Sequence, residues 1–508
     1  MRIRPTCACL VLAFAVRFCF ASDVLIKNVL VYDGSGKKPS KQDVRIKGDR
    51  IAAVAKHLAP QSGETVRDEH GLALAPGFID MHSHHDTGIF KDLDAASVTR
   101  QGVTTVFVGQ DGESNFPLAD FFTHLEKTPA AINFASMVGH ATLRQQIMGK
   151  DLYRPSTPEE LNKMKDLLGR ELQAGAFGLS SGLEYEDGHF ATTEELIELS
   201  KVAGASGGFY ISHVRDEGNK VFDSFEEITR IGREGKLPVE ITHIKLASTP
   251  VWHMTKTRMP EVFARAKKQG VDLKADVYPY TYWHSTLRVI VTDRDFYNPK
   301  RVAEGISDNG GAANLMIPKY TPEPAMAGKT LEQIAAAWGV TPVDAYIRMI
   351  KATSSETEGG EEQEEVIGTS MSEDDVRWFI AAPRVMFCSD GALHGAHPRG
   401  AGAFPRVLGR YVREQHVLPL ETAIHKMTMM PAAQLGLKDR GRVVPGYVAD
   451  LVVFDPATVI DESTIEHPQA PPKGIPDVMV AGEWVVFNGA VTGAHPGHVL
   501  RRASSLNQ

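Results

Sequence analysis

Hydrophobic and polar positions alternate near both ends of the chain, and a different pattern fills the middle. Alternation over four to eight residues is typical of half-buried strands, and a Gly-Ser-Gly turn closes the first stretch. The alternating stretches are DVLIKNVLVYDGSG (23–36), QDVRIKGDRIAAVA (42–55), GRVVPGYVADLVVFDP (441–456) and PDVMVAGEWVVFNGA (476–490). We therefore predict one small β domain formed from both termini, residues 22–72 and 436–500.

The middle of the chain repeats short apolar strands followed by amphipathic helices. The eight candidate strands are GFIDMHSH (77–84), TTVFVG (104–109), INFASMVGH (132–140), FGLSSGL (177–183), FYISHV (209–214), VEITHIK (239–245), LKADVYPY (273–280) and VMFCSD (385–390). Helices are predicted at 157–175, 192–207 and 222–236, the first two opened by Thr-x-x-Glu capping signals. Eight alternations favour a closed (β/α)8 TIM-like barrel over an open doubly wound sheet, and we place it at residues 73–435.

Almost a hundred residues separate the seventh and eighth candidate strands. This is far longer than an ordinary loop, so we predict an inserted subdomain or lid at residues 284–379. Within it, SSETEGGEEQEE (354–365) is an acidic polar tract. Such composition is typical of a solvated loop.

Composition narrows the class of protein. The chain has 508 residues, of which 43% are hydrophobic and 23% charged, and its formal net charge is −8. These values are those of a globular protein with a sizeable core, and they provide no basic excess to attract nucleic acid or anionic lipid. The expected partner is a small molecule, and an anionic one requires local positive groups. The sequence leaves the oligomeric state open.

Residues 1–21 (MRIRPTCACLVLAFAVRFCFA) have the pattern of a secretory signal peptide. Two early arginines precede an apolar stretch that is too short to span a bilayer, and a small residue precedes Ser22. We therefore expect cleavage and export, to the periplasm or the medium, with no membrane span after the leader is removed. Three of the four cysteines lie in this leader, so Cys388 stands alone in the mature chain and no intrachain disulfide can form.

The first barrel strand ends in HSHHD, residues 82–86. Because side chains alternate along a strand, His82 and His84 point the same way and His85 points the other way. Two imidazoles make half of a zinc site, which needs three or four protein ligands. Asp80 shares the parity of the two histidines, and we expect it to orient one of their imidazoles.

Other polar residues close later strands of the predicted barrel. His213 ends the fifth strand, His243 ends the sixth, and Asp390 ends the eighth. In a (β/α)8 barrel the chemistry gathers at the carboxyl ends of the strands. We therefore expect these side chains to meet His82 and His84 at one rim and to bind metal.

Longer stretches of the sequence resemble a known family. The motifs are GAFGLSSGLEY, SHVRDEG, SDG followed by HPR, FPRVLGRYVRE and RGRVVPGYVADLVVFDP. Together with the histidine pattern they resemble the N-acyl-D-amino-acid deacylases, or D-aminoacylases, of the amidohydrolase superfamily. The resemblance covers residues 24–500. It implies zinc, a barrel with a β domain made from both termini, and an insertion near the seventh strand.

The resemblance also assigns roles to individual residues. His213 and His243 match the ligands of a tightly held zinc, and His82 and His84 match those of a second, weaker position. Asp390 matches the catalytic acid/base. The family commonly has cysteine in a Gly-Asn-Cys-Gly turn after the second strand, where this chain has Gln110 and Asp111.

The departure at Asp111 bears on the metal. We favour Asp111 as a ligand over a mere turn residue, but oxygen selects zinc less strongly than thiolate does, so one or two divalent ions remain open. Glu184 is a reserve carboxylate at the end of the fourth strand. That strand has no lysine to match the carbamylated lysine of many related enzymes.

The resemblance implies amide hydrolysis by metal-activated water, with Asp390 as general acid/base. Lys245 and Arg399 match positions that bind the substrate carboxylate, and Tyr185 and Tyr278 are candidate hydroxyl donors. The predicted reaction releases a carboxylate and a free D-amino acid from an N-acyl-D-amino acid. The D preference rests on the resemblance alone.

Three other functions stay open at this point. One is a dipeptidase acting on peptides with a C-terminal D-residue, since an aminoacyl group is also an acyl group. The second is a cyclic-amide hydrolase, which the missing lysine disfavours. The third is a scaffold without activity, which only the departure at Asp111 favours.

Overall fold

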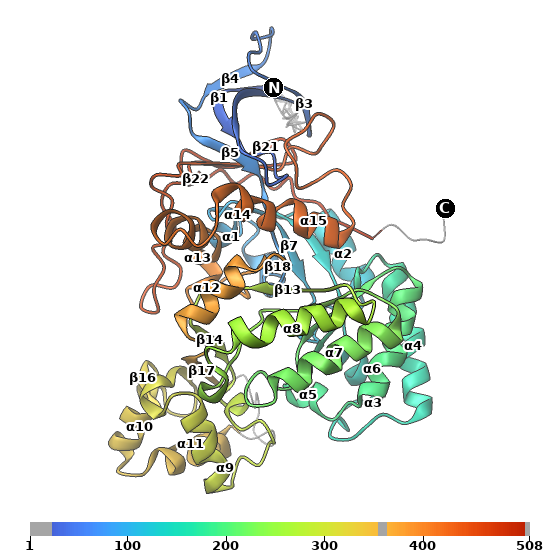
Figure 1. Ribbon diagram of the computed structural model, residues 1–508, viewed down its shortest axis with the longest axis vertical. Coiled ribbons are helices and arrows are strands. Elements are labelled where there is room, and N and C mark those ends of the chain that lie inside the picture. Colours follow the sequence, from blue (N-terminus) through green and yellow to red (C-terminus); the bar gives the residue numbers. More distant parts are fainter. Residues whose placement is uncertain (1–22, 354–362, 503–508) are drawn as a thin grey trace, which may run out of the picture.

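The computed structural model describes residues 23–353 and 363–502. The leader predicted at 1–21 and most of the acidic tract predicted at 354–365 lie outside the described residues. A β domain lies at one end of the molecule, a barrel fills the middle, and an α/β insertion lies at the other end (Figure 1).

Eight parallel strand positions form a closed barrel in the described part of the chain. The third predicted strand is split into β8 and β9, which pair with β7 and β10 respectively and so join two sheets. Hydrogen bonds from Asp390 N–H to the His82 carbonyl (2.9 Å) and from His84 N–H to the Gly391 carbonyl (2.8 Å) close the ring between the first and last strands. The strands are β6 (Phe78–Asp80), β7 (Val103–Val108), β8 (Asn133–Ser136), β9 (Val138–Gly139), β10 (Gly178–Gly182), β11 (Phe209–His213), β12 (Val239–Ile241), β13 (Leu273–Val277) and β18 (Val385–Phe387). The predicted barrel is confirmed.

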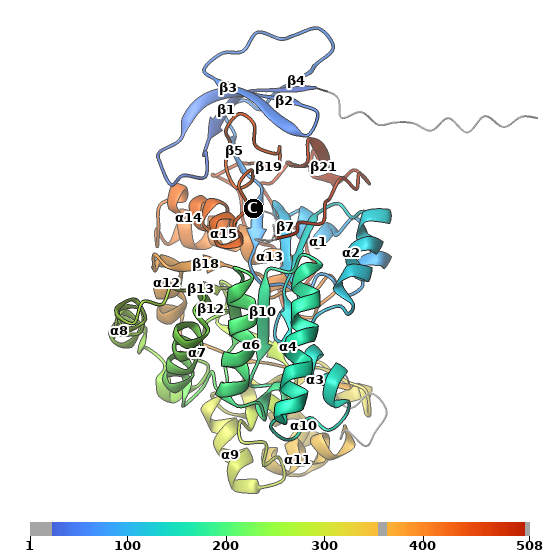
Figure 2. The same cartoon turned by 90° about the vertical axis from the view of Figure 1, so that its right-hand side faces the viewer.

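Helices cover the outside of the barrel, with α4, α6, α7 and α8 side by side around the strands (Figure 2). Thr157 and Thr192 cap α4 and α6 as their sequence signals predict. The helices are α1 (Ala96–Thr99), α2 (Leu118–Lys127), α3 (His140–Met148), α4 (Pro158–Gln173), α5 (Glu186–His189), α6 (Thr193–Ala205), α7 (Val221–Gly235), α8 (Thr255–Lys268), α12 (Glu373–Ala381), α13 (Arg399–Arg406), the π-helix η7 (Val407–Glu414), α14 (Leu420–Met427) and α15 (Met429–Leu435). Among the described residues, none of the helices has the length and apolar character that crossing a membrane requires.

Both ends of the chain build the β domain, which is a nine-stranded sheet in the described ranges. Its order is β22-β21-β20-β19-β5-β1-β2-β3, with β4 paired to β1. The strands are β1 (Val24–Val31), β2 (Ser40–Lys47), β3 (Arg50–Ala55), β4 (Thr65–Asp68), β5 (Ala73–Pro76), β19 (Leu451–Phe454), β20 (Asp477–Val480), β21 (Glu483–Phe487) and β22 (Ala490–Val491). Because β5 pairs with β19 and leads directly into β6, it ties this sheet to the start of the barrel.

The insertion after β13 has its own hydrophobic core and its own four-stranded sheet. Its elements are β14 (Tyr282–Ser285), α9 (Pro299–Asp308), β15 (Met316–Tyr320), β16 (Lys329–Thr330), α10 (Leu331–Trp338), α11 (Pro342–Ala352) and β17 (Glu364–Thr369). The predicted boundary at residue 379 extends too far. Helix α12 buries Val376, Phe379 and Ile380 in the core of the barrel, so the insertion ends after β17.

Candidate active site

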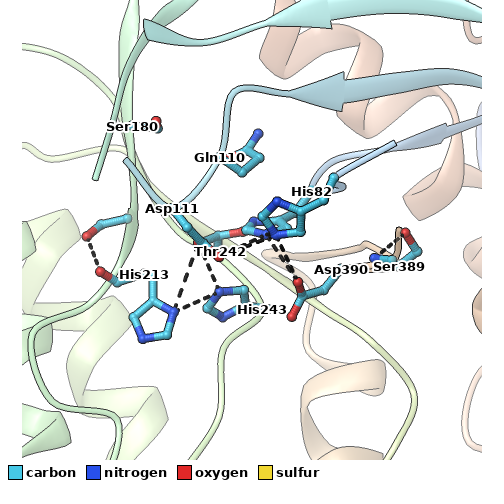
Figure 3. Close-up of polar contacts among 12 residues, drawn as sticks. His82, Gln110, Asp111, Ser180, His213, Thr242, His243, Ser389 and Asp390 are labelled. Atoms are coloured by element: carbon cyan, nitrogen blue, oxygen red, sulfur yellow. Dashed lines mark hydrogen bonds and ion pairs between the residues drawn. The ribbon is translucent and has the colours of Figure 1, made fainter. Parts of the chain in front are cut away.

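Three residues at the carboxyl ends of barrel strands have left-handed backbone. They are Asp111 after β7 (φ 55°), His243 after β12 (φ 33°) and Asp390 after β18 (φ 49°). Such conformations cost on the order of 1–3 kcal/mol each for residues other than glycine, and they gather at functional sites. Each side chain leaves the alternation of its strand here and turns toward the barrel axis, where Figure 3 shows the three pointing toward one another.

One group of metal-binding side chains consists of His82, His84, Asp111 and Asp390, which we call the His82 group. The Nε2 atoms of His82 and His84 lie 3.3 Å apart. Asp390 Oδ1 lies 3.4 Å from both of these nitrogens, and Asp111 Oδ2 lies 3.5 Å from both. The alternation predicted for His82 and His84 therefore brings their nitrogens together, although β6 ends at Asp80.

A second group consists of Asp111, His213 and His243, which we call the His243 group. His243 Nε2 lies 3.2 Å from Asp111 Oδ1 and 3.1 Å from His213 Nδ1. Asp111 thus turns one carboxylate oxygen toward each group. Its place between the groups is where a shared ligand would lie.

The donor atoms fit a divalent metal centre. Each group offers two imidazole nitrogens and at least one carboxylate oxygen within 4.8 Å of one another. Imidazole and carboxylate are ordinary zinc ligands, and two or three of them leave positions for water or substrate. His213 and His243 with Asp111 would hold one ion, and His82 and His84 with Asp111 would hold another.

Carboxylates contact the outer nitrogens of the His243 group. Glu184 Oε2 lies 2.9 Å from His213 Nε2, on the side of the ring away from Asp111. Glu217 Oε1 lies 3.3 Å from His243 Nδ1 and accepts a hydrogen bond from Lys245 Nζ at 2.8 Å. Glu184 and Glu217 form with His213 a third group of possible metal donors, so Glu184 keeps the place of a reserve carboxylate that the sequence predicts. The sequence interpretation missed Glu217, whose only sequence signal is the acidic pair Asp216-Glu217 in HVRDEG.

A hydroxyl holds the outer nitrogen of His82. Thr242 Oγ1 lies 2.6 Å from His82 Nδ1 and donates to Asp276 Oδ1, which also accepts the backbone N–H of His243 at 2.7 Å. The expectation that Asp80 orients an imidazole is wrong. The Asp80 carboxylate instead accepts the backbone N–H groups of Ser389 and His82, and so ties the ends of β18 and β6 together.

Lys245 and Arg399, predicted to bind the substrate carboxylate, are both buried and line the same cavity. Arg399 Nη1 lies 2.6 Å from Asp390 Oδ2. Lys245 Nζ contacts His243 Nδ1 at 2.7 Å. The predicted strand 239–245 is too long, because β12 ends at Ile241, and Lys245 lies in the segment that follows.

The two predicted tyrosines lie beside these cations. Tyr278 packs against both, with its ring centroid 5.6 Å from Lys245 Nζ and 4.9 Å from Arg399 Cζ. Its buried hydroxyl has no hydrogen-bond partner among the described residues. Tyr185 lines the cavity, and its ring lies 4.5 Å from that of His213.

Local charges fix the ionisation of the key groups. Burial raises the pKa of Asp390, but Arg399 and the neighbouring histidines outweigh burial and hold the pKa well below its usual value. Burial lowers the pKa of Lys245, but Glu217 outweighs burial and raises it, so the ammonium stays charged. Burial raises the pKa of Tyr278 to about 12. At neutral pH these groups are a carboxylate, an ammonium and a phenol.

The cavity has a volume of about 300 Å³, and the barrel and the insertion share its walls. The barrel contributes His213, His243 and Asp390 at the inner end. The insertion contributes Trp283, the loop 289–293 and one face of α9 at the outer end. The insertion therefore shapes the space beyond the candidate metal ligands.

His85 and Cys388 do not face this chemistry. His85 is fully buried, and neither ring nitrogen has a hydrogen-bond partner in the described ranges, as expected for a side chain that points away from His82 and His84. Cys388 is also buried, and burial first, then nearby carboxylates, raises the pKa of its thiol well above the usual value. It is a packed, protonated thiol.

A closed (β/α)8 barrel with histidine and aspartate donors clustered at its carboxyl rim defines a metal-dependent barrel hydrolase. The chain belongs to the amidohydrolase family, whose model matches residues 65–486. The resemblance predicted from the sequence is thus confirmed.

Individual relatives narrow the comparison. A D-aminoacylase from Alcaligenes xylosoxydans xylosoxydans is 38% identical over 95% of this chain and 98% of the relative. An N-acyl-D-glutamate deacylase from the same organism is 35% identical over 95% and 97%. The solved N-acyl-D-glutamate deacylase of Bordetella bronchiseptica, complexed with zinc and a phosphonate inhibitor that mimics the tetrahedral intermediate, is 32% identical. It matches with a TM-score of 0.83 over 95% of this chain and 100% of that one.

Proposed function

We propose that this protein is a zinc-dependent amidohydrolase that hydrolyses the amide bond of N-acyl-D-amino acids. The products are a carboxylate and a free D-amino acid. One observation carries the proposal: Asp390 lies between the metal donors of the His82 group and the guanidinium of Arg399, in a cavity that also exposes Lys245. The side chains for the three parts of the reaction, the metal ligands, the acid/base and the carboxylate anchor, are therefore adjacent.

A bound zinc ion supplies Lewis acidity toward water and toward the substrate carbonyl. The two oxygens of Asp390 have different surroundings. Oδ2 is held by Arg399 at 2.6 Å, whereas Oδ1 faces His82 and His84. Because its pKa lies well below the usual value, Asp390 is ionised at neutral pH, and Oδ1 can take a proton from the attacking water. Asp390 then returns this proton to the departing amine nitrogen.

The remaining residues bind and orient the substrate. The Lys245 ammonium has three donor hydrogens and Arg399 has five, so each retains donors for the substrate carboxylate beside its contacts within the protein. The ring of Tyr278 packs against both cations, and its buried hydroxyl keeps its proton. Burial, then the charges of Asp111 and Asp390, raises the pKa of Tyr185 well above its usual value, so Tyr185 is a hydroxyl donor at the cavity wall.

The first experiment is amine release from a panel of N-acetyl-D-amino acids, N-acetyl-L-amino acids and L,D-dipeptides. It uses metal-quantified protein beginning at Ser22. Release confined to the acetyl-D substrates supports the proposal. Activity on L,D-dipeptides alone would make the protein a dipeptidase, and silence across the panel in metal-loaded protein would overturn the proposal in favour of a cyclic amide or a scaffold.

We also infer that the protein is exported. The support is the charged start, apolar stretch and small residue of positions 1–21. Cell fractionation of the full chain and of a chain lacking residues 2–21 tests this. Export of the full chain alone, with Ser22 as the mature N-terminus, is the expected result; equal retention of both in the cytoplasm would reject export.

A further inference from the structure

The outer end of the cavity is acidic. Four ionisable side chains line it: Asp293 in the loop before α9, and Arg301, Glu304 and Asp308 on α9. We call these four the outer wall. The spacing of the α9 residues, three and four apart, places them on one face of the helix, and that face is turned toward the cavity.

The single cation of the outer wall is already paired. Arg301 Nε lies 2.5 Å from Asp293 Oδ2, and its Nη1 contacts the Glu304 carboxylate. Asp308 accepts a hydrogen bond from Asn219 Nδ2 at 2.7 Å. In the described part of the chain, no lysine or arginine forms an ion pair with Asp308. Three carboxylates against one guanidinium leave a net formal charge of −2.

The outer wall faces the Lys245 side of the cavity. Asn219, which donates to Asp308 of α9, also accepts a 2.9 Å hydrogen bond from Ser248. These two residues follow Glu217 and Lys245 closely along the chain and line the same cavity. If Lys245 anchors the substrate carboxylate, the α-carbon lies beside it. The acyl group lies across the scissile bond, toward the metal donors. The group that extends to the outer wall is therefore the side chain of the D-residue.

The cavity also has apolar lining. Trp283, Val289 and Ile290 contribute it, and the outer wall adjoins the last two along the chain. A long side chain with an aliphatic stem and a charged end matches such a cavity, because the stem packs on apolar atoms while the cation reaches the carboxylates. An anionic side chain of similar length meets repulsion at the same place.

We propose that the outer wall selects N-acyl-D-amino acids with cationic side chains, such as D-lysine and D-arginine, and disfavours those with anionic side chains. This inference rests on the proposed function and names its substrate class. The residues of the outer wall are partly exposed, so solvent and salt screen the selection. We expect kcat/KM to change roughly tenfold between two substrates that differ by one charge, which is the scale of several weak ion pairs.

The test compares kcat/KM for substrates matched in shape. N-acetyl-D-lysine is compared with N-acetyl-D-norleucine, and N-acetyl-D-glutamate with N-acetyl-D-glutamine. We expect D-lysine to exceed D-norleucine and D-glutamate to fall below D-glutamine, each about tenfold at low salt. Both ratios approach one in 0.5 M NaCl. Equal or inverted ratios at low salt would overturn the proposal.

Variants separate the outer wall from other sources of selectivity. Asp308→Asn keeps an acceptor for Asn219 and removes one charge, so it lowers the D-lysine preference severalfold, and Asp308→Lys inverts it. The matched control is Glu332→Gln, an exposed position on α10 of the same insertion, which leaves both ratios unchanged. A D-lysine preference that survives Asp308→Lys would reject the outer wall as its cause.

Binding distinguishes this inference from the proposed function. Calorimetry with metal-loaded Asp390→Asn protein compares the dissociation constants of N-acetyl-D-lysine and N-acetyl-D-norleucine without turnover. Hydrolysis with no charge preference rejects the outer wall alone. Preferential binding of the D-lysine derivative with no hydrolysis by the unsubstituted protein rejects the deacylase reaction and supports the outer wall. If neither preferential binding nor hydrolysis is observed, the outer wall and the deacylase reaction are both rejected.

Discussion

The two pairs of histidines in the active site differ in what holds their outer nitrogens. In the His243 group Glu184 lies 2.9 Å from the outer nitrogen of His213. The outer nitrogen of His243 has Glu217 at 3.3 Å and the Lys245 ammonium nearer, at 2.7 Å, so His213 carries the difference between the two groups. In the His82 group the outer nitrogen of His82 faces the hydroxyl of Thr242 at 2.6 Å. A carboxylate on the outer nitrogen makes an imidazole more basic and a stronger metal ligand than a neutral partner does. We therefore expect the His243 group to bind metal more tightly.

Burial distinguishes the two pairs through His84 alone. The side chain of His84 is 37% exposed, whereas those of His82, His213 and His243 are 0%, 5% and 1% exposed. A buried ion pair is screened less by salt than an exposed one, and a chelator reaches an exposed ligand first. The structure thus supplies a physical reason for the order of affinity that the family resemblance implies.

The largest expected effect is a loss of turnover without a loss of the more tightly bound metal. It concerns Asp390 of the His82 group. Asp390→Asn removes the proton acceptor but keeps the shape of the side chain. We expect kcat to fall at least about a hundredfold, the scale of a lost general acid/base, or about 2.7 kcal/mol. The ion held by the His243 group should stay, because Asp390 is not one of its donors.

Steady-state kinetics and metal analysis by mass spectrometry on the same protein sample check this prediction. Near-normal turnover would reject Asp390 as the acid/base. Loss of all metal would instead show that the two groups do not bind independently.

Asp111 links the groups that the comparison separates. Its two oxygens face different histidine pairs, so Asp111→Ala removes a donor from both, and we expect metal content to fall in both. Asp111→Asn retains one acceptor oxygen, and we expect it to lose about one ion, from the weaker His82 group. Titration with a chromogenic chelator measures both stoichiometry and release. Unchanged metal content in both variants would assign Asp111 to the turn alone.

The sequence predicted most of this architecture but not the contacts that distinguish the two groups. The barrel follows from the repeating strand and helix pattern, and convergence of strand ends brings His82, His213 and His243 together in any closed barrel. The alternation of side chains along a strand does not predict directions beyond the ends of the strands. His243 lies after β12 and has left-handed backbone, so alternation cannot predict the direction of the Lys245 side chain.

The contacts of the outer nitrogens were beyond sequence reasoning for a different reason. Glu217 and Thr242 act through distances set by loops after β11 and β12, and spacing along the chain does not fix how a loop folds. Asp80 illustrates the same limit. Its carboxylate accepts the backbone N–H of Ser389, 309 residues away along the chain, and that of His82, two residues away.

A smaller effect tests directly whether the partners of the outer nitrogens set metal affinity. The two partners tested are the Glu184 carboxylate and the Thr242 hydroxyl. Glu184→Gln replaces the carboxylate beside His213 by a neutral amide of the same shape. Changes of this kind cost roughly 10- to 100-fold in metal affinity. The matched control is Thr242→Val, which removes the neutral partner of His82 and should change affinity in the His243 group little. Competition with a chelator of known affinity measures the metal affinity of each variant. If Thr242→Val lowers the affinity of the His243 group more than Glu184→Gln does, the outer carboxylate is not what strengthens that group.

The smallest expected effect concerns Lys245, which contacts His243 and Glu217. Lys245→Met removes a buried cation that we assign to the substrate carboxylate, and we expect KM for N-acetyl-D-amino acids to rise about tenfold, the scale of one charge-assisted hydrogen bond. The control is the substrate: an N-acetyl-D-amino acid amide has no carboxylate, so its kcat/KM should be nearly the same in both proteins. Metal content is measured alongside, because Lys245 also contacts Glu217 and His243. Equal losses on both substrates, together with lost metal, would place Lys245 among the residues that hold the metal ligands and not among those that bind substrate.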